Sequence, residues 1–376
     1  GNDTLTGGAD NDTLDGGADI DTFDESASSS DFTITMNSSG GTSIGNGTDT
    51  LTNIENLTTG SGDDTFNISD SADNIINANG GTNDIVNVIN ASGTVTITRA
   101  VSGDVTVTDT GGNVGNDLYQ NVEFVNVAGG AGDDTFILTD EFDNIIDGQG
   151  GSNTIDYSGV TTVINVNVLA GSTQIIAPEL GTDTLLNIQN ITTGSNDDSF
   201  YVENNGVDNI LDGGAGSFDD VTYRKITDTP GTISATRSGN SITIEVEGDT
   251  DELNNFETVI IQGSNSADTF IINDNQNNSL DGNGGTDTYD SSSFSSADTT
   301  VTTNGGTITV ASSDVGTDTL VEFEAVTTGA GNDRFVINTS QAGTYIFDAG
   351  SSTLGNIFEF TNGGGAVVRV TISTSS

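Results

Sequence analysis

Short apolar segments recur along this chain at intervals of nine or ten residues, and turns rich in Gly, Asn and Asp separate them. In one stretch the centres of these segments are Leu57, Phe66, Ile75, Ile85, Val95 and Val105. Within a segment apolar and polar residues alternate, as in residues 32–36 and 95–98, which is the period of a strand with one buried face. We therefore expect short strands joined by turns, and almost no helix.

A second, longer period accompanies the first. The phrase G-T-D-T-L at residues 47–51 returns, intact or loosened, with its Leu at positions 118, 185, 253 and 320, so successive copies are 67, 67, 68 and 67 residues apart. The phrases N-I-E-N-L-T-T-G, S-G-D-D-T-F and D-N-I-I-x-x-x-G-G return within the same repeats. Self-similarity at a fixed period is typical of proteins that stack one structural unit on copies of itself.

Together the two periods predict an all-β fold, a parallel β-solenoid of five repeats after a short partial repeat. Short strands at this spacing also suit a β-sandwich or a barrel, but neither of these needs internal repeats. Two-sided and three-sided coils both fit, since 67 residues hold about seven strand-and-turn units. We place the partial repeat at 1–46 and the repeats of one continuous solenoid at 47–114, 115–180, 181–247, 248–315 and 316–376.

Charge narrows the choice of partners. The chain carries 56 acidic and 6 basic residues, a formal net charge of −50, so it is a poor partner for a nucleic-acid backbone. It contains no cysteine and no apolar run long enough to span a membrane. Asp outnumbers Glu by 43 to 13 and lies in Gly-rich turns, where short carboxylates suit Ca²⁺. A generally acidic surface, which favours solubility at high salt, is the alternative explanation.

The most compact repeat is at residues 7–24, which read G-G-A-D-N-D-T-L-D and then G-G-A-D-I-D-T-F-D. Each copy has a Gly pair, an Asp followed by Thr, and one apolar residue, Leu14 or Phe23. This sequence resembles the nonapeptide of RTX, or haemolysin-type, calcium-binding proteins. The resemblance is highly specific over these residues and moderate over the rest of the chain.

The resemblance implies calcium ions held between turns that stack on the same side of the coil. Asp12 and Asp21 match the aspartate of the motif, and the glycines at 7–8 and 16–17 match its Gly pair. Leu14 and Phe23 match its buried residue. Asp10 and Asp19 replace its third glycine, which adds a carboxylate and brings the turn geometry into question.

Other Asp-rich turns extend the candidate ligands along the chain. If the S-G-D-D-T-F turns of adjacent coils lie about 4.8 Å apart, their carboxylates repel one another strongly unless cations intervene. The Asp of G-T-D-T-L either binds an ion or caps its turn. The candidate metal ligands are Asp3, Asp10, Asp12, Asp19, Asp21, Asp49, Asp63, Asp64, Asp117, Asp133, Asp134, Asp147, Asp183, Asp197, Asp198, Asp212 and Asp318. The residues expected to form a stacked interior ladder are Phe66, Phe136, Phe200, Phe270 and Phe335.

We expect a secreted structural protein that holds several Ca²⁺ ions, and not an enzyme. The chain has no His, and its few cations are scattered apart from the pair Arg224-Lys225. The first residues resume the repeat almost where the last ones stop, which favours copies stacked head to tail in a surface filament such as a fimbria or matrix fibre. The alternatives are the repeat region of a giant adhesin or surface-layer protein, and a carbohydrate-binding module of a polysaccharide-modifying enzyme that contacts surface glycans. The T-T-G pairs offer weak support for an ice-binding face.

Overall fold

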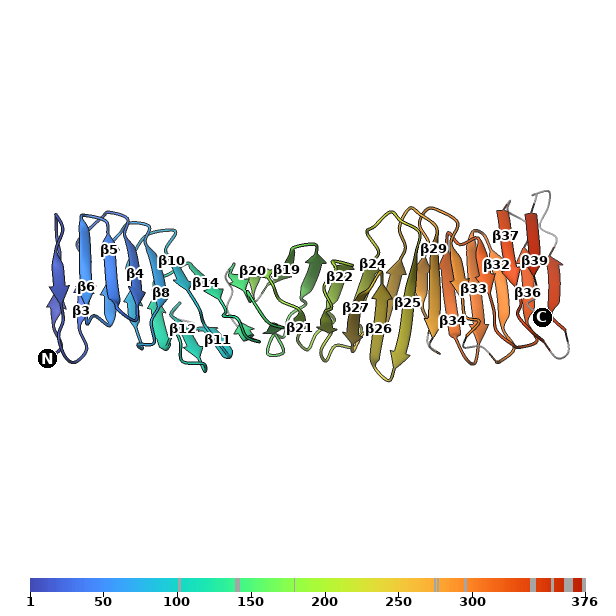
Figure 1. Ribbon diagram of the computed structural model, residues 1–376, viewed down its shortest axis with the longest axis horizontal. Coiled ribbons are helices and arrows are strands. Elements are labelled where there is room, and N and C mark those ends of the chain that lie inside the picture. Colours follow the sequence, from blue (N-terminus) through green and yellow to red (C-terminus); the bar gives the residue numbers. More distant parts are fainter. Residues whose placement is uncertain are drawn as a thin grey trace. The chain divides into compact units, whose positions relative to one another are not determined.

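The computed structural model describes residues 1–100, 103–138, 143–178, 180–273, 275, 277–293, 296–338, 343–352, 355–361 and 368–373. These residues form strands β1 to β39 and no helix (Figure 1). The part of the chain that is described therefore has no helix that could cross a membrane. Two compact units are present, one of Gly1–Val166 with Gly171–Ser195 and the other of Asn167–Ala170 with Asn196–Ser376.

The strands of the first unit are short and separated by turns of a few residues. They are β1 (Thr4–Leu5), β2 (Thr13–Asp15), β3 (Thr22–Asp24), β4 (Thr33–Asn37), β5 (Gly40–Ile44), β6 (Thr48–Thr52), β7 (Asn56–Thr58), β8 (Thr65–Ser69), β9 (Ile75–Asn77), β10 (Ile85–Val88), β11 (Thr94–Arg99), β12 (Val105–Asp109), β13 (Asn116–Gln120), β14 (Phe124–Ala128), β15 (Thr135–Leu138), β16 (Ile145–Asp147), β17 (Thr154–Asp156), β19 (Ser172–Ala177), β20 (Gly181–Leu186) and β21 (Asn190–Thr192). Strand β18 (Asn165–Leu169) is divided between the two units.

The second unit continues the same pattern of short strands. Its strands are β22 (Ser199–Glu203), β23 (Ile210–Asp212), β24 (Asp220–Arg224), β25 (Gly231–Ser238), β26 (Ser241–Val246), β27 (Asp249–Asn254), β28 (Thr258–Gln262), β29 (Asp268–Asn273), β30 (Ser279–Asp281), β31 (Thr288–Asp290), β32 (Thr300–Asn304), β33 (Thr307–Ser312), β34 (Gly316–Val321), β35 (Ala325–Thr327), β36 (Arg334–Asn338), β37 (Gly343–Asp348), β38 (Ile357–Thr361) and β39 (Val368–Ser373).

Each unit has two sheets, A and B, and single strands alternate between them. Strands β7 and β9 pair in sheet A, whereas β8 and β10 pair in sheet B, so the chain coils from one sheet to the other and back. Pairing between successive coils is parallel and in register, as for Phe66 with Val86 and Phe136 with Ile155. The predicted parallel β-solenoid is therefore confirmed, and its coil has two sides.

Each repeat also contains three strands that fold back on one another in one sheet, a meander. Strands β4 to β6 pair antiparallel in sheet B, β11 to β13 in sheet A, β25 to β27 in sheet A, and β32 to β34 in sheet B. A tight turn makes this reversal possible between β25 and β26, where Gly239 has a φ of 64°, which glycine adopts without strain. The sequence patterns predicted these strands but not their antiparallel pairing.

The meander explains how seven strands fit one repeat. The G-T-D-T-L phrase starts β6, β13, β20, β27 and β34, which are seven strands apart, as the spacing predicted. One meander and four single strands make five visits to the two sheets, an odd number. Equivalent segments of successive repeats therefore lie on opposite sheets, and their S-G-D-D-T-F turns do not stack on one another. The expected column of these turns, 4.8 Å apart, is wrong for this reason.

A thin core runs between the two sheets, because alternate residues of each strand point inward. Phe66, Phe136, Phe200, Phe270 and Phe335 are all 0–1% exposed, as expected for interior residues. They do not form one ladder, since β8 and β22 belong to sheet B whereas β15 and β29 belong to sheet A. They contact other residues instead, as Phe200 contacts Phe256 with ring centroids 4.9 Å apart.

Two further expectations fail in the details of burial. Phe23 is buried, but Leu14 is only half-buried because β2 pairs with β6 alone within the described residues. The second Thr of each T-T-G phrase is buried: Thr59, Thr193 and Thr328 are each 0% exposed. Their hydroxyls therefore do not form a flat outer face of the ice-binding kind.

Candidate functional site

The two nonapeptide turns at the N-terminus share one backbone conformation. The second glycine of each pair and the Asp two residues later have φ between 79° and 93°: Gly8, Asp10, Gly17 and Asp19. Asp10 and Asp19 stand where the motif has its third glycine, and both are left-handed. Asp tolerates this conformation better than most residues. The amides of Gly7 and Gly8 donate to Oε1 of Glu25 at 2.8 and 2.9 Å, so this turn binds a carboxylate of its own chain.

The residues that precede the strands connect successive coils through their side chains. The amide of Asp3 donates to Oδ1 of Asp21 at 2.6 Å, and the amide of Asp21 donates to Oε2 of Glu55 at 2.9 Å. Each amide thus binds a carboxylate of the following coil. We call a row of three such residues, Asp–Asp–Glu, a carboxylate relay.

Carboxylate relays recur in three of the later repeats. Their two hydrogen bonds measure 2.6 and 2.8 Å in Asp64–Asp84–Glu123, 2.7 and 2.8 Å in Asp198–Asp219–Glu257, and 2.8 and 2.9 Å in Asp268–Asp287–Glu324. The second repeat has Asp134–Asn153–Gln189 in the same places, with bonds of 2.9 and 2.8 Å. We call this row the amide relay, because two of its carboxylates are replaced by carboxamides.

In each Asp-Asp pair the first residue, which we call the outer Asp, accepts an amide from the following coil. Oδ1 of Asp63 accepts the amide of Thr82 at 2.9 Å, and Oδ1 of Asp133 accepts the amide of Ser152 at 2.7 Å. The inner residue Asp64 instead accepts the amide of Phe32, in the preceding coil, at 2.7 Å. Two adjacent carboxylates therefore bind one coil to both of its neighbours.

The Asp of G-T-D-T-L is a buried acceptor for three donors. Oδ1 of Asp251 accepts the amide and the side-chain Nδ2 of Asn209, both at 2.8 Å, and its Oδ2 accepts the Tyr223 hydroxyl at 2.6 Å. The same Asn–Asp–Tyr arrangement occurs at Asp117, Asp183 and Asp318. Asp49 has a different partner: its Oδ1 accepts the amide of Asp12 at 3.0 Å. The main-chain amides that these carboxylates accept lie 37 to 43 residues earlier in the sequence, so the carboxylates join two coils.

The middle Asp of each carboxylate relay has an oxygen that accepts no hydrogen bond from the described residues. This is Oδ2 of Asp21, Asp84, Asp219 and Asp287, all four at most 1% exposed. Burial raises the pKa of Asp84 and of Asp219 to about 6 and that of Asp287 to about 7, and neighbouring carboxylates add to the effect. The sites of Asp84, Asp219 and Asp287 therefore favour a proton or a cation beside Oδ2.

In the amide relay a hydrogen-bond donor stands where the carboxylate relays have Oδ2. Nδ2 of Asn153 takes the place of the second carboxylate oxygen and donates to the carbonyls of Asn187 and Gly150 at 2.9 and 3.2 Å. In the relays of Asp21 and Asp287 a carboxylate oxygen lies near a main-chain carbonyl instead. At Gly16 an added Cβ would contact both Oδ2 of Asp21 and the carbonyl of Asn53, so these two acceptors border one small space.

The predicted ligands differ in how far their side chains are exposed to solvent. Six are exposed: Asp3, Asp10, Asp19, Asp63, Asp133 and Asp197. Three are half-buried: Asp12, Asp147 and Asp212. Eight are buried: Asp21, Asp49, Asp64, Asp117, Asp134, Asp183, Asp198 and Asp318. Asp147 and Asp212 each cap a turn, with Oδ1 accepting the amides of Gln149 and Gly214 at 2.9 Å.

The donor chemistry of these turns fits Ca²⁺ in part. Carboxylate and carbonyl oxygens are the ligands that Ca²⁺ prefers, and it takes six to eight of them. Within the described ranges no group of three or more Asp and Glu side chains is close enough to hold a metal. An ion would therefore be held by one or two carboxylates, by main-chain carbonyls such as that of Asn53, and by water.

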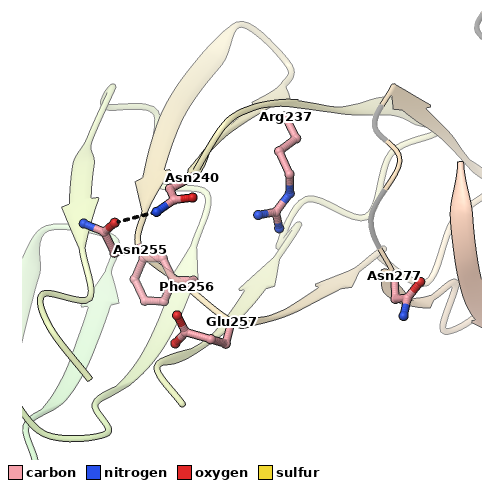
Figure 2. A pocket seen from close by; sticks show the side chains of 6 residues that line it. All are labelled: Arg237, Asn240, Asn255, Phe256, Glu257 and Asn277. Atoms are coloured by element: carbon pink, nitrogen blue, oxygen red, sulfur yellow. Dashed lines mark hydrogen bonds between the residues drawn. The ribbon is translucent and has the colours of Figure 1, made fainter. Parts of the chain in front are cut away.

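A polar cavity of about 340 Å³ lies elsewhere in the second unit (Figure 2). Arg237, Asn240, Asn255, Phe256, Glu257 and Asn277 line it. Figure 2 shows the Arg237 side chain entering this cavity, with Nδ2 of Asn240 donating to Oδ1 of Asn255 at 3.5 Å. Glu257 of this cavity also accepts the amide of Asp219 and belongs to a carboxylate relay.

Sequence reasoning missed several residues of the relays. The Glu of N-I-E-N and its counterparts Glu123, Gln189, Glu257 and Glu324 end the relays, although this phrase was used only as a marker of the repeat. Asp84, Asp219 and Asp287 occupy the place of Asp21, and the signal was their position two residues before a buried apolar strand residue. No protein-family model matches this sequence, and no curated protein matches it significantly.

Proposed function

We propose that the chain is an extracellular structural protein whose stacked coils are stabilised by calcium ions. One observation supports this proposal most strongly. Four carboxylate relays cross the coils, and the middle Asp of each has a buried oxygen without a hydrogen-bond partner in the described part of the chain. A net charge of −50 adds a general repulsion that bound cations would relieve.

Asp21 illustrates how an ion would be held. Its Oδ1 binds the Asp3 amide, which leaves Oδ2 beside the carbonyl of Asn53. Asn53 has a φ of 51°, the left-handed conformation. At the equivalent place in a later coil, Oδ2 of Asp287 and the carbonyl of Glu322 border the space beside Gly282. In this proposal the ion offsets the charge of the relay and ties two coils together.

We also propose that a further coil pairs with β1 and β2. Within the described residues β1 pairs only with β3, and β2 only with β6. The apolar side chains of these strands, Leu5 and Leu14, are half-buried, whereas Phe23 in the next coil is fully buried. A coil added here would cover both leucines. Supplied by a second copy, it produces a filament; supplied by the same polypeptide, it produces a longer adhesin or surface-layer rod.

Negative-stain microscopy of the purified protein in calcium and in chelator tests this proposal. We expect fibres in calcium that shorten or dissolve in chelator. Leu14→Asp should prevent assembly and leave the circular dichroism spectrum in calcium unchanged, whereas Ile20→Asp, at an exposed turn position, should assemble normally. Single particles under both conditions would contradict assembly. A β-sheet signal that is equally stable in both would contradict the role of calcium.

The cavity of Figure 2 favours one alternative, a site for a polar ligand such as a sugar. Arg237 and three Asn side chains offer donors and acceptors to hydroxyl groups, and Phe256 supplies an apolar wall. Binding of acidic and neutral oligosaccharides can be measured by calorimetry with the wild type and with Arg237→Ala. No binding by the wild type would reject this alternative.

A further inference from the structure

The only lysine of the chain, Lys225, is fully buried in the second unit. Its Nζ lies 3.1 Å from Oδ1 of Asp268, and both side chains are 0% exposed. Oε1 of Glu247, whose side chain is 31% exposed, lies 3.6 Å from the same Nζ. Lysine is almost never fully buried, because the removal of an ammonium group from water is costly. Its presence in this place therefore requires a specific explanation.

The fold itself does not require a lysine here. In every repeat the residue at this point of the coil donates its amide to a carbonyl of the next coil, as Lys225 does to Gln262 at 2.9 Å. Ala91 donates in the same way to Ala128, and Ser291 to Thr327, each at 3.0 Å. Glu25 and Tyr157 make the same bond in two other coils, so side chains of several kinds satisfy the position. The amine is a particular property of this coil.

The carboxyl group of Asp268 is held in one orientation by other donors. Its Oδ2 accepts the amide and the hydroxyl of Ser264 at 2.7 and 2.9 Å, and its Oδ1 accepts the amide of Gly231 at 3.2 Å. Such donors draw electron density from Cγ and would stabilise a negative oxygen during attack on it. The carboxyl group is therefore oriented and polarised as an electrophile.

Hydrogen bonds also fix the position of the Lys225 amine. Main-chain carbonyls of Thr227 and Thr229 accept from Nζ at 2.8 and 2.6 Å and direct it toward Asp268. Because Nζ lies 3.1 Å from Oδ1, it is in direct contact with the carboxyl group that it would attack. The hydroxyl of Thr227 donates to Glu247 at 2.7 Å and that of Thr229 at 2.9 Å, and these hydrogen bonds lower the pKa of Glu247. Glu247 is therefore ionised, and its Oε1 lies 3.6 Å from Nζ.

We propose that Lys225 and Asp268 form an intramolecular isopeptide bond, with Glu247 moving the proton. The ammonium first transfers one proton to the Asp268 carboxylate. The neutral Nζ then attacks Cγ, and a tetrahedral intermediate forms with its negative oxygen among the Ser264 and Gly231 donors. Glu247 takes a proton from Nζ and returns it to the leaving hydroxyl. The Cγ–O bond breaks, one water molecule leaves, and no oxidant or reductant is needed.

This bond would join the turn after β24 to the start of β29, in the next coil. It would serve as a covalent tie between coils in a chain that has no cysteine. Its formation does not depend on calcium, because all the participating groups belong to the chain. It is therefore independent of the function proposed above.

Intact-mass spectrometry of the purified, denatured wild type tests this inference directly. We expect a mass lower than that of the sequence by one water molecule, and a pair of joined peptides containing Lys225 and Asp268 after proteolysis. An amine-reactive reagent should then label only the N-terminus of the unfolded protein. The full sequence mass, together with labelling of Lys225, would overturn the proposal.

Three variants separate the bond from a simple ion pair. Lys225→Arg keeps a cation and should show the full mass. Glu247→Gln should leave a larger fraction of the protein without the bond, whereas Glu245→Gln, an exposed position on β26, should react like the wild type. Equal extents of bond formation in Glu247→Gln and the wild type would reject the proton-transfer role of Glu247.

Discussion

The relay at Asp64–Asp84–Glu123 and the amide relay of the next repeat occupy the same place in their coils, yet they differ in charge. Asp84 Oδ1 and Asn153 Oδ1 accept equivalent amides at 2.6 and 2.9 Å. Their remaining atoms differ: Nδ2 of Asn153 donates to two carbonyls, whereas Oδ2 of Asp84 is buried and accepts no hydrogen bond within the described residues. Only one of these two relays is complete with the atoms of the chain.

This difference shows that the coil geometry does not require carboxylates at the relay positions. Asparagine and glutamine provide the same acceptors, and they avoid the cost of burying a negative charge beside carbonyl oxygens. Retaining Asp and Glu in four relays is therefore costly unless a proton or a cation is bound. The calcium binding that we propose would offset this cost.

The largest effect that we expect is a dependence of calcium-free stability on pH. The pKa values of Asp84, Asp219 and Asp287, about 6, 6 and 7, exceed the ordinary value of 3.8. Between pH 4 and 7 the folded protein therefore binds more protons than the unfolded chain, so stability falls as pH rises. Over this range each group should lower the free energy of unfolding by roughly 3 to 4 kcal/mol. Thermal unfolding in chelator at several pH values measures this; a midpoint that rises over the same range would contradict it.

A carboxylate introduced into the amide relay should have the next largest effect on stability. Asn153→Asp removes two donated hydrogen bonds and adds a buried charge, which should destabilise the first unit by about 3 kcal/mol in chelator at pH 8. Calcium should restore part of the loss. The matched control Asn126→Asp, on a half-buried outward position of β14, should cost much less. Equal losses for the two variants in chemical denaturation would break the comparison.

The reverse substitution should stabilise the protein by a smaller amount. Asp84→Asn supplies the donor that Asn153 has, and we expect a gain of about 1 to 3 kcal/mol at pH 8 in chelator. The gain should shrink at pH 4.5, where the wild-type carboxyl group is protonated in the folded state. Denaturant unfolding at both pH values measures this difference, and a loss of stability at pH 8 would count against the account.

The smallest effect concerns the exposed carboxylates. Asp63→Ala removes the acceptor for the Thr82 amide at the surface, where water can replace it, and should cost about 0.5 to 1 kcal/mol. Asp133→Ala, its counterpart above Ser152, should cost the same, because this outer bond is alike in the two repeats. A difference larger than about 1 kcal/mol between these variants would show that the outer carboxylates also take part in ion binding.

The sequence predicted the parts of the fold that follow from spacing. The steps between Leu51, Leu118 and Leu185 predicted seven strands a repeat, and the inward alternation predicted burial of residues such as Phe66. These predictions succeed because strand period and coil length are local properties of the chain. The two-sided coil remained open, since the turn sequences suit both shapes.

The relays could not be predicted because they depend on register between distant residues. Asp84 and Glu123 are neighbours only because the intervening meander, β11 to β13, lies in the opposite sheet and leaves β10 beside β14. The two chain reversals of this meander therefore decide which carboxylates meet. For the same reason the turns of S-G-D-D-T-F were wrongly expected to stack on one another.

Hydrogen exchange of individual amides tests the central claim, that the carboxylate relays need a bound cation and the amide relay does not. The amides of Asp64 and Asp84 should be compared with those of Asp134 and Asn153 at pH 8, in calcium and in chelator. We expect exchange of the first pair to accelerate at least about tenfold in chelator, which corresponds to roughly 1.4 kcal/mol, while the second pair changes little. Equal acceleration of both pairs, or none in either, would contradict this account.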